Sequence, residues 1–165
     1  KITDGVIIDG WVEHTKLQDR LLLSDVFAFP SIREFGGAVV LEAMAIGLVP
    51  VVMDYGGPGE LVSPETGYAI PMGNRQEIIT RVAKSLEELT ADPANLRKMG
   101  DKARQRVLQH FTWDAKAAMV LKVYQWVLGQ RDDKPSFGMP LPDVMSQSQT
   151  MSQATQPSVT VGPLA

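Results

Sequence analysis

The sequence predicts an α/β fold, in which helices cover both faces of a parallel β-sheet. Four short and mainly apolar runs, at residues 6–9, 26–29, 49–53 and 67–70, are separated by segments with helical periodicity. Continuous apolar runs of this length are typical of parallel strands that are buried on both faces. The chain has 165 residues, 44% of them hydrophobic, so it is long enough for one domain with an ordinary core.

Two helices are expected in the first part of the chain. Thr15 and Gln18 have the spacing of a capping box, in which both side chains bind free backbone N–H groups at a helix start. A second helix is expected over residues 38–46, and Gly47 ends it. Residues 56–59, Gly-Gly-Pro-Gly, are expected to form only a loop.

Capping signals predict three further helices in the second half of the chain. Asn74 and Glu77 form an Asn-initiated variant of the capping box, Asp92 precedes a helix with Pro93 at its first position, and Thr112 caps the last helix. Each helix then carries an apolar stripe that predicts packing against the core. The three stripes are Ile78, Ile79, Val82, Leu86 and Leu89; Leu96, Met99, Ala103 and Val107; and Trp113, Ala117, Val120, Tyr124 and Val127.

The composition changes near the end of the chain to Pro, Ser, Gln and Thr, and no charged residue follows Asp143. Such a segment cannot bury enough apolar surface to offset the entropy lost on ordering. We therefore expect a folded domain over residues 1–128 and a disordered tail over residues 129–165. Because the chain starts with Lys1 and soon reaches an apolar run, we expect it to be the C-terminal piece of a longer protein.

Charge and composition exclude several classes of function. A net charge of −3 without a cluster of Lys and Arg argues against a nucleic-acid partner. No apolar run approaches the ~18 residues of a membrane span, and no G-x-G-x-x-G motif follows a predicted strand, which argues against a dinucleotide oxidoreductase. With no cysteine, and with His14 and His110 far apart, we expect no metal site. These features favour a cytoplasmic protein.

The segment 29–50 carries the chemistry, because a Gly-rich loop there joins a predicted strand to a predicted helix. Gly36 and Gly37 leave space at the helix start, where a phosphate can approach the free N–H groups of Gly37, Ala38 and Val39. Ligands of open α/β sheets bind at the carboxyl ends of the strands, which is where this loop lies.

Glu42 follows about one turn into the same helix. Helical side chains lean toward the helix N-terminus, so its carboxylate can reach the predicted phosphate site. A carboxylate suits vicinal hydroxyl groups, which donate two hydrogen bonds to it. Phosphate and hydroxyl groups together indicate a nucleotide sugar; the alternative is that Glu42 only complements the helix dipole.

Glu34 and Glu42 are separated by seven residues, and Gly37 lies three residues after the first glutamate. In this arrangement the chain resembles glycosyltransferase family 4, the group 1 glycosyltransferases, which have the GT-B fold. The resemblance covers nearly all of residues 5–128. Further matching elements, in order, are Gly10, Ser24-Asp25, Pro30-Ser31, Glu42-Ala43-Met44-Ala45, Gly47, Pro50, Gly56-Gly57, Glu60, Thr66-Gly67 and Phe111-Thr112-Trp113.

The resemblance implies a role for each residue of the segment. It implies that Glu42 binds the ribose hydroxyls and that Glu34, in the catalytic position, contacts the hydroxyls of the donor sugar. The backbone amides of the intervening loop would meet the distal phosphate and the sugar. This loop consists of Phe35, Gly36, Gly37 and Ala38.

Three more residues are candidates for donor binding. By the resemblance, Trp11 and Val12 frame the base, although core packing or a lid over the strand end is an equal alternative for Trp11. Ser31 is a candidate for a hydrogen bond near the phosphate; its alternative is a plain turn former after Pro30. Glu60 is expected to cap loop amides, with contact to the ligand as the alternative.

The resemblance implies that this chain is a Rossmann-like parallel sheet, namely the N-terminally truncated, C-terminal donor-binding half of a GT-B enzyme. Such an enzyme transfers a sugar from a nucleotide-diphosphate sugar with retention and without a metal ion or other cofactor. A glycan, lipid-linked or small-molecule acceptor would bind to the missing N-terminal half, so this chain alone is expected to be inactive. The alternatives are a nucleotide-sugar epimerase, with acid and base residues from the absent half, and a non-catalytic binding module.

The chain departs from the family pattern in two ways. The family usually has a small residue and then an aromatic one after the first glutamate, whereas here Phe35 comes first and Gly36 second. This inversion bears on the sugar preference. The second departure is an absence: the family's basic Arg/Lys pair that binds the diphosphate lies upstream of the segment compared here.

The mixed charges over residues 97–106 are expected to form a solvated helix face. The alternative is that they touch an anionic membrane surface at the inner face of the membrane.

Overall fold

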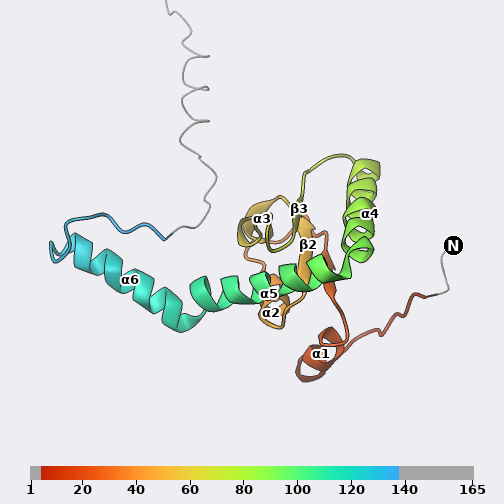
Figure 1. Cartoon of the computed structure of the whole chain (residues 1–165), viewed down its shortest axis with the longest axis horizontal. Coiled ribbons are helices and arrows are strands. Elements are labelled where there is room, and N and C mark those ends of the chain that lie inside the picture. Colours follow the sequence, from red (N-terminus) through yellow and green to blue (C-terminus); the bar gives the residue numbers. More distant parts are fainter. Residues whose placement is uncertain (1–4, 138–165) are drawn as a thin grey trace, which may run out of the picture. The chain divides into compact units, whose positions relative to one another are not determined.

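The computed structural model describes residues 5–137. Within them the chain forms three strands and six helices, in the order α1, β1, α2, β2, α3, β3, α4, α5 and α6 (Figure 1). One compact unit that ends at Pro135 holds all of these elements, and a second unit starts at Ser136. The predicted tail, residues 129–165, therefore lies mostly outside the described residues.

The three strands form one parallel sheet in the order β1-β2-β3. β1 is Val26–Phe29, β2 is Val49–Met53 and β3 is Tyr68–Ile70. All five residues of β2 are buried, as expected for a central strand that is covered on both faces. The predicted α/β fold with a parallel sheet and flanking helices is confirmed, and three of the four predicted strands form.

The side chains of β2 divide the core into two clusters, one on each face of the sheet. Val52 packs against α2 (Ala38–Ala45) and the second half of α5 (Pro93–His110). Val49, Val51 and Met53 point the other way, toward α4 (Arg75–Ala91) and the first half of α5. Strand geometry produces this alternation, because successive side chains point to opposite faces. The cluster on the α2 face consists of Val40, Met44, Val52, Leu61, Val62, Ala103 and Val107.

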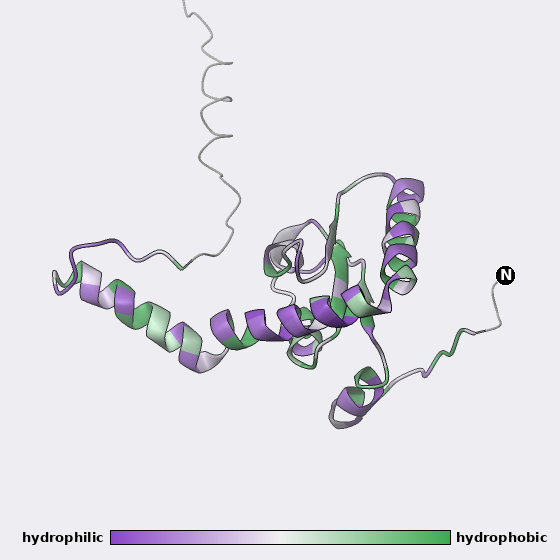
Figure 2. Ribbon diagram, in the orientation of Figure 1, coloured by the Kyte–Doolittle hydropathy of each residue, from purple (hydrophilic) through white to green (hydrophobic). Residues whose placement is uncertain are grey.

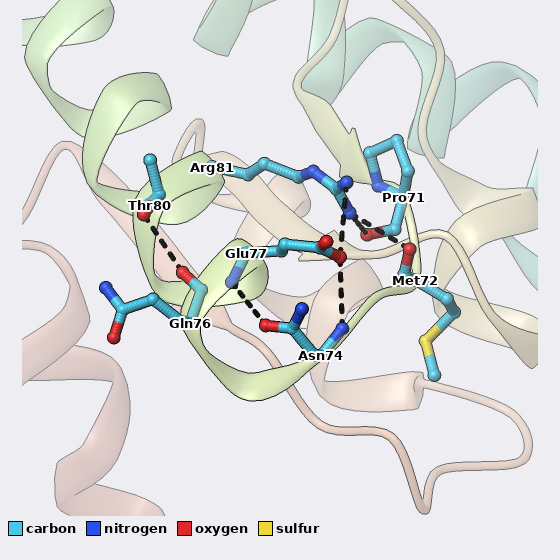
Figure 3. Close-up of polar contacts among 7 residues, drawn as sticks. All are labelled: Pro71, Met72, Asn74, Gln76, Glu77, Thr80 and Arg81. Carbon is cyan, nitrogen blue, oxygen red and sulfur yellow. Dashed lines mark hydrogen bonds and ion pairs between the residues drawn. The ribbon is translucent and has the colours of Figure 1, made fainter.

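The predicted capping box starts α4 (Figure 3). The Glu77 backbone N–H donates to the Asn74 side chain at 3.0 Å, and the Asn74 N–H donates to the Glu77 carboxylate at 3.1 Å. Arg81 pairs with the same carboxylate at 3.6 Å and donates to the carbonyls of Pro71 and Met72, each at 2.9 Å. The box therefore also fastens α4 to the segment that follows β3.

The two other predicted caps in the second half are confirmed. The Asn95 N–H donates to the Asp92 carboxylate at 3.0 Å at the start of α5, where Pro93 is the first helical residue. The Ala115 N–H donates to the Thr112 hydroxyl at 3.2 Å at the start of α6 (Trp113–Val127). Each cap satisfies a backbone N–H that has no partner within the helix.

Two predictions near the start of the chain are wrong. Residues 6–9 form no strand, and Ile7 and Ile8 are 86% and 89% exposed, because β1 pairs only with β2 and no described strand lies beside this segment. The predicted capping box of Thr15 and Gln18 is absent. α1 (His14–Leu21) begins before Thr15, and its N-cap residue makes no side-chain capping bond.

The expectation that residues 56–59 form only a loop is also wrong, because they lie in the short helix α3 (Gly56–Leu61). Pro58 is the third residue of α3, and a proline is tolerated in the first turn since the N–H there has no helical partner. Gly57 serves packing. A β-carbon at this position would lie 2.3 Å from the carbonyl oxygen of Phe35, so only glycine allows this approach.

The apolar stripe of α6 does not pack into the core, contrary to the prediction. α6 has no buried residue, although apolar residues run along it (Figure 2). Trp113 is 91% exposed and Tyr124 is 61% exposed. The stripes of α4 and α5 do contact the core, except that Ile79 is 48% exposed. Periodicity identified the helix in each case, but burial depends on which elements lie beside it.

Candidate functional site

The carboxyl ends of β1 and β2 hold the candidate site. The loop 30–37 follows β1, and Asp54 and Tyr55 follow β2. The Gly57 N–H donates to the carbonyl of Phe35 at 2.9 Å, so the two strand ends are joined directly. Beside this link lies a pocket of about 520 Å³ lined by Ile32, Arg33, Glu34, Phe35, Tyr55 and Gly56.

The Glu34 carboxylate binds the loop that follows it. Its Oε1 atom accepts hydrogen bonds from the backbone N–H groups of Phe35 at 3.1 Å, Gly36 at 3.2 Å and Gly37 at 3.1 Å. Three consecutive N–H groups that converge on one point form an anion-binding concavity. Three of the four loop amides that the resemblance assigns to the phosphate and sugar, those of Phe35, Gly36 and Gly37, therefore converge, and in this structure they hold a carboxylate; the N–H groups of Ala38 and Val39 are not among them.

Gly37 fixes the geometry where this loop enters α2. It is the N-cap residue and has the left-handed conformation, with φ of +70°, which glycine adopts without steric cost. A β-carbon there would also lie 3.0 Å from Cγ of Pro58 in α3. Gly36 differs, because a β-carbon on it would meet no atom within 4 Å and its φ is not positive. Of the two glycines, Gly37 is the one that the fold requires.

Glu42 lies on the side of α2 that faces away from the core. The buried residues of α2 are Val40, Ala43 and Met44, whereas Glu42 is exposed. Within residues 5–137 its carboxylate makes no hydrogen bond and no ion pair. Glu42 does not line the pocket beside the Glu34 loop, and its contact with a ligand stays a prediction.

The remaining predicted donor-binding residues, Ser31, Trp11 and Val12, do not line the pocket beside the Glu34 loop. Ser31 is half-buried, and its hydroxyl accepts a long hydrogen bond of 3.4 Å from the Arg33 N–H, as a turn former would. Trp11 is 87% exposed and Val12 is half-buried, and neither lines the pocket described above. Their contacts with a donor base stay predictions.

Sequence reasoning missed Arg33 as a residue of the pocket, and it considered Tyr55 only as a residue after a strand end that could line the cleft. Arg33 precedes Glu34 directly, and Tyr55 is the second residue after β2, so both follow strands at the edge that carries the site. The position of a residue after a buried parallel strand was the available signal. The predicted role of Glu60 as a cap is wrong, since its exposed carboxylate makes no hydrogen bond within residues 5–137; Glu34 caps the loop amides instead.

A second polar cluster lies at the other edge of the sheet, beside the loop 63–66 that precedes β3. Arg106 donates from Nε to the carbonyl of Leu61 at 2.9 Å and lies 5.7 Å from the ring centre of Phe111. Burial lowers the pKa of Arg106 from its ordinary value. Arg106 and His110 lie in the last turns of α5, where a cation complements the helix dipole. This cluster is structural, because it fastens α5 to α3.

Among residues 5–137, no helix is both long enough and apolar enough to span a membrane. The same residues contain no group of three or more His, Asp or Glu side chains arranged to hold a metal ion.

Comparisons with known proteins identify relatives of the chain. The chain is 33% identical to Alpha-maltose-1-phosphate synthase of Mycolicibacterium smegmatis over 115 residues, which cover 68% of this chain and 30% of that protein. It is 30% identical to Glycogen synthase of Mycobacterium tuberculosis over 128 residues, or 76% of this chain and 30% of that protein. The solved structure of sucrose-phosphate synthase from Thermosynechococcus elongatus matches with a TM-score of 0.60 and 30% identity, over 74% of this chain and 30% of that one.

The chain thus spans about 30% of the length of these relatives. The profile of the family "Glycosyl transferases group 1" matches residues 1–106, which include the sheet, the Glu34 loop and most of α5. On this match, the chain belongs to the group 1 glycosyltransferase family.

Proposed function

We propose that this chain is the C-terminal donor-binding half of a retaining GT-B enzyme of glycosyltransferase family 4. The observation that carries the proposal is the convergence of three loop N–H groups on one point at the carboxyl edge of the sheet. That point adjoins a pocket of about 520 Å³, and α2 presents the exposed Glu42 one turn further on. Anion donors and a free carboxylate together fit the diphosphate and the sugar hydroxyls of a nucleotide sugar.

Each group has a distinct task in this proposal. The N–H groups of the loop from Phe35 to Ala38 bind the distal phosphate, Glu42 binds the ribose hydroxyls, and Glu34 binds the donor sugar. As the bond from the sugar to the phosphate breaks, negative charge grows on the diphosphate, and preorganised N–H groups stabilise it. This chemistry requires no metal ion and no further cofactor.

The acceptor belongs to the part of the protein outside this chain. Because the chain spans about 30% of the length of its relatives, we propose that it binds the donor but is inactive alone. The names of those relatives favour hexosyl transfer in glycan or polysaccharide synthesis, with a glycan, lipid-linked or small-molecule acceptor. A cytoplasmic location, with the charged face of α5 touching the inner face of the membrane, belongs to the same proposal.

Substitution of Glu42 tests the proposal in the full-length enzyme. Hydrogen bonds to a charged group contribute about 1.5–3 kcal/mol each, so Glu42→Ala should weaken binding of the donor about 10- to 100-fold. Calorimetric titration with UDP-glucose and GDP-mannose would measure this and indicate the base. Glu87→Ala is the matched control, because Glu87 is an exposed glutamate on α4, away from the site. Unchanged donor affinity in Glu42→Ala would refute the assignment.

A further inference from the structure

The structure gives the Glu34 carboxylate the position in which the proposed function puts a phosphate. We propose that Glu34 acts as an internal placeholder: its carboxylate occupies the loop amides in the donor-free protein, and the diphosphate of the donor displaces it. Displacement would then release Glu34 to bind the sugar of the same donor. This inference rests on the proposed function, and it adds an order of events at the site.

The Glu34 carboxylate contacts the loop amides through one oxygen atom. All three N–H groups donate to the same oxygen, Oε1, at 3.1–3.2 Å, and within residues 5–137 the second oxygen of Glu34 has no partner. A phosphate oxygen at the point of convergence would take the place of Oε1. The two anions cannot share it, because they would repel each other at contact distance. Donor binding at these amides therefore requires the carboxylate to leave.

The loop is held in place independently of Glu34, so the carboxylate can leave without collapse of the amides. The Phe35 carbonyl accepts from the Gly57 N–H at 2.9 Å, which fastens the loop to α3. Gly37 packs closely against Pro58, where a β-carbon would lie 3.0 Å from the proline ring. These contacts involve the backbone of the loop and α3, and none of them involves the Glu34 carboxylate.

The pocket beside the loop can accept the displaced carboxylate. The pocket beside the loop is lined by both Glu34 and Arg33, and Arg33 is exposed and forms no ion pair with any residue of the described part of the chain. Rotation of the Glu34 side chain into this pocket brings its charge toward a cation. There the carboxylate also lies beside the loop that holds the phosphate, where the donor sugar is expected.

The placeholder predicts that one substitution changes the affinities for two ligands to different extents. A site that must first release its own carboxylate binds an anion more weakly than a vacant site does. Glu34→Ala should therefore bind a nucleoside diphosphate about 3- to 10-fold more tightly than the wild type. The same variant should bind the nucleotide sugar more weakly relative to the diphosphate, since the contact from Glu34 to the sugar is lost.

Calorimetric titration of the full-length enzyme with UDP, GDP, UDP-glucose and GDP-mannose measures both effects. Glu34→Gln is the second variant; it keeps the size of the side chain and an acceptor oxygen but removes the charge, and we expect an intermediate gain for the diphosphate. Unchanged or weaker diphosphate binding in both Glu34 variants, with binding by the wild type, would overturn the placeholder. If the wild type binds none of the four ligands, the proposed function itself fails.

A measurement without any ligand tests the placeholder contact separately. The amide protons of Phe35, Gly36 and Gly37 can be followed by NMR in full-length enzyme labelled selectively with 15N at Phe and Gly. At one pH, the three amide resonances should shift together between the wild type and Glu34→Ala, because the oxygen that all three bind is removed. Resonances that stay unchanged in Glu34→Ala would contradict the contact.

Discussion

Residues 49–53 and residues 6–8 are similar in composition, yet their environments in the structure are opposite. β2 reads Val-Pro-Val-Val-Met, and every one of its residues is buried. The segment Val6-Ile7-Ile8 is also apolar and is β-branched throughout, but its side chains are 58%, 86% and 89% exposed. β2 has a strand on each side and helices over both faces, whereas no strand or core cluster formed by residues 5–137 includes the earlier segment. An apolar run therefore predicts a tendency to form a strand, and the neighbouring elements decide its burial.

Among the substitutions that test this comparison, one at Met44 should change the free energy of unfolding most. Met44 lies on α2 at 0% exposure, against the face of β2 that carries Val52. Met44→Ala leaves a cavity that close-packed neighbours fill only in part, so it should lower the free energy of unfolding by about 2–5 kcal/mol. Urea denaturation followed by circular dichroism measures the loss. Met72→Ala is the control, because Met72 is 44% exposed, and it should lose far less. Equal losses in both variants would mean that the α2 face is not the core.

Where sequence reasoning about the fold succeeded, the signal was local and the partners lay close along the chain. The cap at Asn74 depends on Glu77, three residues away, and both bonds form as predicted. Most failures concern contacts between distant segments, although the local capping box predicted at Thr15 and Gln18 is also absent. The burial of the α6 stripe depends on what lies beside that helix, and Gly57 of α3 is explained by the Phe35 carbonyl, more than 20 residues earlier.

The candidate site, like the fold, was predictable from the sequence only in part. The separation of Glu34 and Glu42, with glycines between them, identified the loop and the helix that carry the predicted contacts. The bond from Glu34 to its own loop was not predictable, because it depends on a loop backbone that brings three successive N–H groups to one oxygen, and residue spacing does not determine that backbone. Tyr55 was weighed only as a residue after a strand end, since its place in the pocket depends on how α3 packs on the loop.

Gly57 lies where α3 packs against the Glu34 loop. Its substitution should lower the free energy of unfolding by an intermediate amount. Gly57→Ala places a β-carbon 2.3 Å from the Phe35 carbonyl oxygen and 2.7 Å from that of Gly36, and both are backbone atoms of the Glu34 loop. Overpacking of this kind costs about 1–3 kcal/mol of stability. It should also weaken donor binding in the full-length enzyme, because the loop must move.

Gly36→Ala provides the matched control for Gly57→Ala. A β-carbon at Gly36 meets no atom within 4 Å, so the free energy of unfolding should change by less than about 0.5 kcal/mol. Urea denaturation of both variants tests this pair. If both lose stability equally, the glycines matter for the flexibility of the loop; the close approach of α3 would then not be the cause.

The smallest change in the free energy of unfolding is expected in the exposed segment, residues 6–8. Ile7→Ser removes an apolar side chain that is 86% exposed, so the stability of this chain should change by no more than about 0.5 kcal/mol. Ile70→Ser changes the same residue type in β3, where Ile70 is 3% exposed, and should cost several times more. Urea denaturation of both variants compares the two environments directly. Repeating Ile7→Ser in the full-length enzyme sharpens the comparison, since a loss there of about 1–3 kcal/mol would mean that residues outside this chain cover the segment.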